Sequence, residues 1–376
     1  SVTVLGAHAL VAVNTSKNFI EASGKLVVVD IAKRSVVTEI PLGGQPDSVA
    51  RSKDGKYVAV VIENERDEGL NKGALPQAPS GYLTIVDTVG APTTWKTRNV
   101  DLKGLATLYP DDAEPEYVSI NDDNVAVVTL QENNHIALVD LPTGKVTRHF
   151  SAGAVTLSQV DLTDAPRPNF VSLTETQANR LREPDGVTWF SKTQFATANE
   201  GDLNGGSRGF TIFNSDGTVA YDAGNSMEHL VARIGHANDK RSDAKGNEPE
   251  NVAFGRYEGT DYLFVASERS SVVAVYDMSQ KNQPVFKQVL PAALAPEGVL
   301  AIPARNLLIA ASENDDRATT STLRSSLNIY QYQSAPAAYP TIQSVNRADG
   351  TPIPWSAMSG LAASPNGSIV YGIDDS

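Results

Sequence analysis

The amino-acid sequence contains no cysteine, so neither a disulfide framework nor a thiolate metal centre can form. It also lacks any run of about 20 apolar residues, the length that a helix needs to cross a bilayer, and we expect no membrane span. Positive charge is scarce: 31 lysines and arginines stand against 44 aspartates and glutamates, a net charge of −13. Because no basic stripe is present to neutralise phosphates, the composition argues against a nucleic-acid partner.

A short acidic phrase recurs along the chain and is its most informative positive feature. In each copy, a proline is followed by Asp or Glu, then by a β-rich segment, and finally by a glutamate. The copies occupy residues 46–63, 115–132, 184–200, 249–268 and 296–313. A repeat of this length that contains a hairpin predicts one supersecondary unit per copy, which is typical of a β-propeller.

Strand-like runs within the repeats give the predicted blades. Runs of Val, Ile and aromatic residues bounded by turns such as Asp54-Gly55 favour antiparallel hairpins. We predict an all-β fold, a seven-bladed β-propeller of four-stranded antiparallel blades, in a single domain over residues 1–376. The last blade either stays short or is completed by the remainder of a longer polypeptide. The predicted blades are 1–41, 45–100, 114–150, 183–223, 248–290, 295–345 and 356–376.

The acidic residues of the phrase are expected to share one face of the propeller. They fall at the start of one strand and the end of its antiparallel partner, which places both at the same end of the hairpin. Long irregular segments at 64–80, 101–113, 151–182, 224–247 and 314–324 are predicted to emerge there too, where function tends to lie. The residues predicted to form this ligand-binding face are Glu63, Glu132, Glu183, Glu248, Glu268, Arg269, Glu297 and Glu313.

Crowded carboxylates favour a bound cation, because they cannot all stay ionised without one unless their pKa values rise. Oxygen-only ligands select hard cations, and a loose multi-carboxylate geometry favours Ca²⁺ as the cofactor. The predicted metal ligands are Glu200, Asp202 and Asn204, in a glycine-rich turn with alternating oxygen donors. The alternative for this turn is a loop held by side-chain hydrogen bonds.

Arginines near the acidic residues have two interpretations. Arg269 directly follows Glu268, and Arg182 directly precedes Glu183. Arginines beside metal-bound carboxylates would suit a phosphate ligand. Alternatively, they cancel carboxylate repulsion by ion pairing.

Several phrases in the sequence resemble the bacterial propellers of the choice-of-anchor I domain family. They are EPEYV at 114–118, TLQENN at 129–134, ANEGD at 198–202, NEPENV at 247–252 and APEGV at 295–299. The resemblance covers residues 1–333 and implies a periplasmic, secreted or cell-surface protein of a family labelled alkaline phosphatase-like or surface protein. The tail, from WSAMSGL at 355–361 to residue 376, resembles the opening of an esterase-like phytase domain.

Two functions from different classes are therefore open. The first is a binding or scaffold domain that takes a small-molecule or protein ligand on an acidic, Ca²⁺-binding face. The second is a metal-dependent phosphoester hydrolase of the alkaline phosphatase or phytase type. The sequence contains no cysteine nucleophile, which favours the first.

Overall fold

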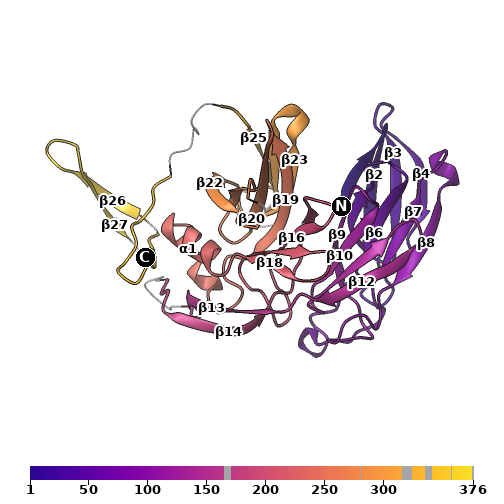
Figure 1. The fold of residues 1–376 in the computed structure, drawn as a ribbon, viewed down its shortest axis with the longest axis horizontal. Helices are drawn as coiled ribbons and strands as arrows, with labels where there is room; N and C mark the ends of the chain where they lie inside the picture. The colour runs from indigo at the N-terminus through magenta and orange to yellow at the C-terminus, as the bar shows by residue number, and fades with distance from the viewer. Residues whose placement is uncertain (165–170, 281, 316–323, 335–340, 357, 375–376) are drawn as a thin grey trace. The chain divides into compact units, whose positions relative to one another are not determined.

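The computed structural model describes residues 1–164, 171–280, 282–315, 324–334, 341–356 and 358–374. The chain divides into two compact units. Unit 1 comprises residues 1–154, 181–206 and 211–221, and unit 2 comprises residues 155–180, 207–210 and 222–376. Both units are built mainly from short antiparallel strands (Figure 1).

Unit 1 is formed by four-stranded sheets in which each strand pairs with the next along the chain. The sheets are β1 (Val2–Leu5), β2 (His8–Asn14), β3 (Gly24–Asp30) and β4 (Ser35–Pro41); β5 (Pro46–Arg51), β6 (Tyr57–Ile62), β7 (Tyr82–Asp87) and β8 (Lys96–Asp101); β9 (Pro115–Ile120), β10 (Val125–Leu130), β11 (His135–Asp140) and β12 (Lys145–Ser151); and β15 (Val187–Trp189), β16 (Gln194–Ala198), β17 (Phe210–Asn214) and β18 (Val219–Asp222). Two 3₁₀ turns, η1 (Asn71–Gly73) and η2 (Pro92–Thr94), lie in its loops.

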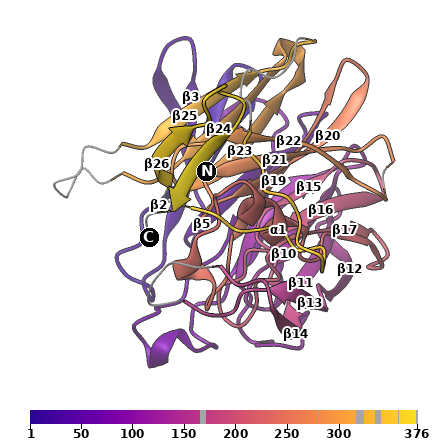
Figure 2. The same cartoon turned by 90° about the vertical axis from the view of Figure 1, so that its left-hand side faces the viewer.

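Unit 2 contains a four-stranded sheet, a three-stranded sheet and two separate hairpins. Its elements are the hairpin β13 (Ala154–Val160) and β14 (Glu175–Leu181); α1 (Ser226–Arg233); η3 (Asp239–Arg241); β19 (Pro249–Tyr257), β20 (Thr260–Ser267), β21 (Val272–Asp277) and β22 (Val285–Pro291); β23 (Pro296–Ile302), η4 (Pro303–Arg305), β24 (Leu307–Ser312) and β25 (Ser326–Gln331); and the hairpin β26 (Met358–Ala363) and β27 (Val370–Asp374). Figure 2 shows this last hairpin as a two-stranded ribbon.

The sheets are the blades of an all-β propeller with four-stranded antiparallel blades. In unit 1 the first strands contact one another in order, β1 with β5, β5 with β9 and β9 with β15, and in unit 2 β19 contacts β23. Among the described residues there are six such sheets, five with four strands and one, β23–β24–β25, with three. The predicted count of seven blades is not confirmed, because residues 356–376 supply only the hairpin β26–β27.

The fourth strand predicted for the sixth blade is not seen among the described residues. Residues 341–345, the described end of the predicted blade 295–345, are not a strand, and residues 335–340 lie outside the described part of the chain. The three-stranded sheet therefore has β25 as its last strand.

The core of unit 1 lies between the faces of consecutive sheets. Strand alternation turns Leu83 and Ile85 of β7 towards the third sheet, where they join Val118 of β9 and Ala126 of β10 in one buried cluster. Both β7 residues have no exposed surface. The central strands β6, β10 and β11 are buried on both faces, as their runs of consecutive buried residues show.

We expect Leu83→Ala to lower the free energy of unfolding by about 2–5 kcal/mol, because it opens a cavity between two sheets that cannot easily collapse. Leu70→Ala, at a side chain that is 48% exposed in a loop of the same unit, is the matched control and should change stability by well under ~1 kcal/mol. Urea unfolding followed by circular dichroism measures both. Equal losses would place the core elsewhere.

Candidate functional site

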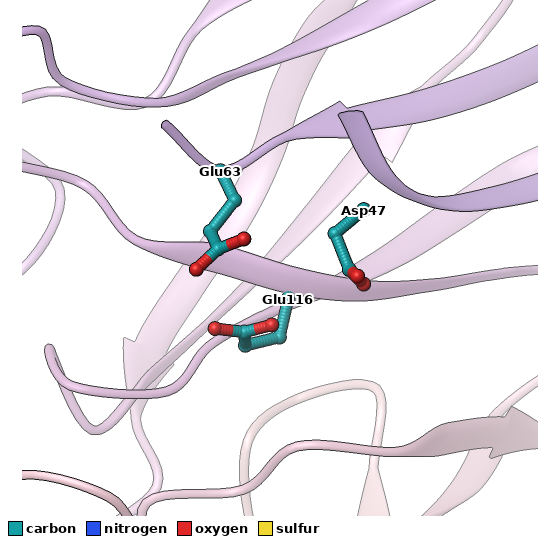
Figure 3. Close-up of side chains that lie close together, drawn as sticks. All are labelled: Asp47, Glu63 and Glu116. Carbon is teal, nitrogen blue, oxygen red and sulfur yellow. The ribbon is translucent and has the colours of Figure 1, made fainter. Parts of the chain in front are cut away.

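Three carboxylates from neighbouring sheets converge in unit 1. Asp47 is the second residue of β5, Glu63 follows β6, and Glu116 is the second residue of β9. One oxygen of each lies within 4.8 Å of the other two. Figure 3 shows the three carboxyl groups pointing towards one another. We call this group the acidic recess.

A β-bulge positions the acidic residue that follows four of the five repeat prolines. In the pairing of β5 with β6, Pro46 lies opposite Ile62 and Val49 opposite Val60, so that Asp47 and its neighbour share one partner. The ladders β9–β10, β19–β20 and β23–β24 have the same irregularity after their prolines. A bulge bends the strand and redirects the side chain. The recurring Pro-acidic phrase is therefore the sequence mark of this bulge.

The recess holds its carboxyl groups in a state that favours protonation. Burial, followed by the charge of Glu65, raises the pKa of Asp47 to about 6. Burial also raises the pKa of Glu63 and of Glu116 well above the usual range, and their neighbouring carboxylates add to the effect. All three side chains are half-buried, so the loss of hydration and mutual repulsion act together.

A second, deeper acidic group lies beside the recess. The Glu132 side chain is buried, its Oε1 accepts a hydrogen bond from Arg66 Nη1 at 2.7 Å, and its charge raises the pKa of Glu116. Burial raises the pKa of Glu114 to about 10, and the charge of Glu132 adds to it. The second oxygens of both glutamates are buried without a hydrogen-bond partner among the described residues. Buried oxygens without a partner are rare and costly, which marks this region as unusual.

Arg66 is the cation that holds this deeper group together. Its guanidinium is buried and pairs with Glu132 and with Asp202 through the same nitrogen. Its Nε also donates to the main-chain carbonyl of Gly73 at 3.0 Å. Desolvation opposes its charge, but the two carboxylates outweigh this and raise the pKa of Arg66.

The predicted calcium loop binds a carboxylate of its own unit. The main-chain N–H groups of Asp202 and Leu203 donate to Glu183 Oε2, and that of Asn204 donates to Oε1, each at 2.9 Å. Glu200 accepts from the amide of Gln131 at 2.7 Å. The loop therefore cradles Glu183, and a metal on Glu200, Asp202 and Asn204 stays a prediction.

In unit 2 the predicted face residues form two groups. Glu248 accepts hydrogen bonds from Arg241 Nε at 2.6 Å and from Arg269 Nε at 2.8 Å, and Arg269 also pairs with Glu268. The arginines next to these glutamates are thus engaged in ion pairs, which is the second of the two sequence interpretations. Glu297 and Glu313 line a separate recess beside β25.

The sequence prediction included only part of the recess. Glu63 was expected on the ligand-binding face, whereas Asp47 and Glu116 entered only as repeat markers. Their position inside the repeat phrase was the signal that could have identified them. Whether the five repeat-end glutamates share one channel mouth stays a prediction, because they are divided between the two units.

A tyrosine-lined pocket of about 280 Å³ lies between the sheets β19–β22 and β23–β25. Its walls include Tyr257, Tyr262, Tyr330 and Tyr332. Elsewhere the fourth strand of a sheet fills this kind of space, as Val146 of β12 does between the second and third sheets. The pocket lies where a fourth strand would pack, and the described residues contain no fourth strand for the sheet β23–β24–β25.

The fold is that of a propeller, and its unit 1 contains a cluster of three carboxylates from neighbouring sheets. The family model of the choice-of-anchor I domain matches residues 1–205 and 203–281, more than half of the chain, and the chain belongs to this family. The family's description fits a cell-surface or secreted protein. A search of curated proteins found no match. No comparison shows the alkaline phosphatase-like label or the phytase-like tail.

Comparison with solved structures finds similar chains at low identity. The chain is similar to a candidate 6-phosphogluconolactonase of Bacteroides uniformis at 13% identity and a TM-score of 0.52, over 98% of this chain and 90% of that one. This likeness indicates a shared fold and carries no information about activity. Virginiamycin B lyase of Staphylococcus aureus is similar at 11% identity and a TM-score of 0.49, over 82% of this chain and 75% of that one, and we draw no conclusion from it. No helix in the described part of the chain has the length and apolarity required to traverse a bilayer.

We expect Arg66→Met to lower the free energy of unfolding by about 3–5 kcal/mol near neutral pH, because Glu132 loses its buried counter-charge. The loss should shrink in mild acid, where the carboxyl groups take up protons. Glu132→Gln in the same chain should restore part of it. The control is Arg98→Met, whose half-exposed pair with Asp87 should be worth at most about 1 kcal/mol. Chemical unfolding at two pH values measures the set, and a pH-independent loss would contradict the assignment.

Proposed function

We propose that this chain is an extracytoplasmic binding or scaffold propeller, periplasmic, secreted or at the cell surface, whose acidic recess binds Ca²⁺. The observation that carries the proposal is the convergence of Asp47, Glu63 and Glu116, with oxygens within 4.8 Å of one another. Three carboxyl groups held so close are costly unless a cation or protons neutralise them. Membership of the choice-of-anchor I family supports the extracytoplasmic role.

The donor set fits a hard cation. All three candidate ligands are carboxylates, and neither histidine nor cysteine belongs to the group. Oxygen-only sites favour Ca²⁺ or Mg²⁺, and Ca²⁺ accepts irregular arrangements of six to eight oxygens. The three ligands come from three different strands or strand ends, and Glu132 lies nearby with an unpartnered oxygen. Asp47, Glu63 and Glu116 would hold the ion.

Bound Ca²⁺ would supply both stability and a place for a ligand. It would neutralise the charges that raise the pKa of Glu63 and Glu116. Three carboxylates do not complete the coordination shell of Ca²⁺, so oxygen atoms of a small molecule or of a partner protein would bind there.

The hydrolase alternative has less support. A metal-bound water could replace a nucleophile, since coordination brings its pKa to about 7. Arg269, one of the arginines expected to hold a phosphate, is already paired with Glu248 and Glu268, and Arg66, which the sequence did not indicate, is paired with Glu132. Phosphate binding would have to break these pairs.

We expect Ca²⁺ to raise the melting temperature of the protein near neutral pH, because it binds the native state alone. A 100-fold excess over the dissociation constant would add about 2.7 kcal/mol. Glu116→Gln should abolish most of the shift, and in the presence of chelator it should itself stabilise the protein, because folding no longer has to bury or protonate this carboxyl group. Glu21→Gln, at an exposed surface carboxylate, is the matched control and should keep the full shift.

The pH dependence of the same melts tests the recess directly. The folded pKa of Asp47, about 6, lies above its usual value, so the metal-free folded state holds extra protons. Its stability should therefore be greatest in acid and fall as the pH rises through about 6. The Ca²⁺ shift should grow over the same interval, because the ion displaces protons. A shift independent of pH, or one unchanged in Glu116→Gln, would place the ion elsewhere.

We expect the chain to release no phosphate from a generic aryl phosphate or from phytate, with or without Ca²⁺. The reason is that Arg66, Arg241 and Arg269 are already engaged in ion pairs with neighbouring carboxylates. A colorimetric phosphate assay measures this. Turnover that disappears in Glu116→Gln but persists in Glu21→Gln would establish the hydrolase alternative.

A further inference from the structure

The hairpin β26–β27 repeats the inner hairpin β5–β6 residue by residue. The pairs in β5–β6 are Val49 with Val60, Ala50 with Ala59 and Arg51 with Val58. The pairs in β26–β27 are Leu361 with Gly372, Ala362 with Tyr371 and Ala363 with Val370. Both ladders have an irregularity at the start of the first strand. The two hairpins therefore share one register, and Leu361 corresponds to Val49 and Val370 to Val58.

The turns of the two hairpins also match. Ser52 Oγ donates to Asp54 Oδ1 at 2.8 Å and accepts a main-chain N–H at 3.0 Å. Ser364 Oγ donates to Asn366 Oδ1 at 2.8 Å and accepts the equivalent N–H at 3.1 Å. Local hydrogen bonds of this kind set the turn and with it the register. The hairpin β26–β27 is thus built as the inner half of a blade.

The hairpins differ in what covers them. Val49 is 7% exposed and Val58 is fully buried, because both pack against the preceding sheet β1–β4. Their counterparts Leu361 and Val370 are 72% and 64% exposed. An apolar hairpin left open in this way exposes surface that soluble proteins normally cover.

The sheet β23–β24–β25 also has an exposed apolar face. Ala311 pairs with Leu327 and Ile309 with Ile329, the register in which Val61 pairs with Leu83 and Ala59 with Ile85 in the second sheet. Leu83 and Ile85 have no exposed surface, whereas Leu327 and Ile329 are 67% and 64% exposed. The face that the second sheet turns to the third is buried, and its counterpart here is uncovered.

The third sheet shows what covers such a face. There, Leu83 and Ile85 share one buried cluster with Val118 of β9 and Ala126 of β10. Val118 pairs with Val128 as Val49 pairs with Val60, so Val118 and Ala126 are the counterparts of Leu361 and Val370. The exposed hairpin β26–β27 therefore carries apolar residues at the two positions that, in the third sheet, cover the equivalent face of the second sheet.

We infer that the hairpin β26–β27 docks through Leu361 and Val370 onto Leu327 and Ile329 of the sheet β23–β24–β25, as the inner half of a seventh blade. The driving force is apolar burial, and the shared register makes the two surfaces fit as the second and third sheets do. The alternative is that a second copy of the chain covers this face of the sheet. The experiment below distinguishes that contact from one made by the hairpin of the same chain.

Paired cysteines test the contact, because the chain has none of its own. Val370 and Tyr371 are adjacent, comparably exposed and on opposite sides of β27. We expect Ile329→Cys with Val370→Cys to form an intramolecular disulfide under mild oxidation several-fold more completely than Ile329→Cys with Tyr371→Cys. Gel mobility of the monomer and mass spectrometry of the linked peptides measure the yield. Equal yields in the two pairs, or disulfide-linked dimers alone, would overturn the inference.

A second measurement needs no cysteine. Leu361→Asp should release the hairpin and speed hydrogen exchange of the β25 amides several-fold, while Tyr371→Asp, on the other side, should leave them unchanged. Circular dichroism verifies that both variants fold. Identical β25 exchange in the two variants would also overturn the inference.

Discussion

Apolar packing between the faces of consecutive sheets is the constraint on which the rest of the structure depends. Central strands such as β6 and β10 are buried on both faces, so neither a slip in register nor a missing neighbour is tolerated there without exposing large apolar side chains. The cluster around Leu83 and Ile85 shows this packing complete. The exposed face of Leu327 and Ile329 shows it interrupted. Packing between consecutive sheets thus explains both the buried cluster and the exposed apolar face.

The acidic recess is a consequence of this packing. Because consecutive sheets must approach closely, the ends of their inner strands converge, and whatever side chains lie there are forced together. The bulges after Pro46 and Pro115 turn an acidic residue into that space. Burial then raises the pKa of Glu63 and Glu116, which opposes stability when the groups are ionised. Natural proteins accept such a conflict where the charges serve a function, which is why the recess is the strongest candidate for a binding site.

The candidate site was only partly readable in the sequence. The repeat phrase marked Asp47 and Glu116, but the sequence does not show which of its many acidic residues lie close together in the fold. The prediction of a metal site therefore concentrated on a glycine-rich loop instead. That loop wraps the Glu183 carboxylate with its main-chain N–H groups. Arg66 was missed altogether, because it lies in a long connection without any pattern, and only its contact with Glu132 reveals its importance.

The sequence by itself determined the all-β propeller with four-stranded antiparallel blades, since strand alternation, turn residues and the repeat phrase are local features that each segment carries alone. It also identified the Pro-acidic phrase, whose bulge is set by the strand and its immediate partner. Only the tertiary structure decided which carboxylates converge, how far burial raises their pKa values, and which apolar faces stay uncovered. These properties depend on neighbours that are distant in the chain, as Asp47 and Glu116 are, and on the exclusion of water between them.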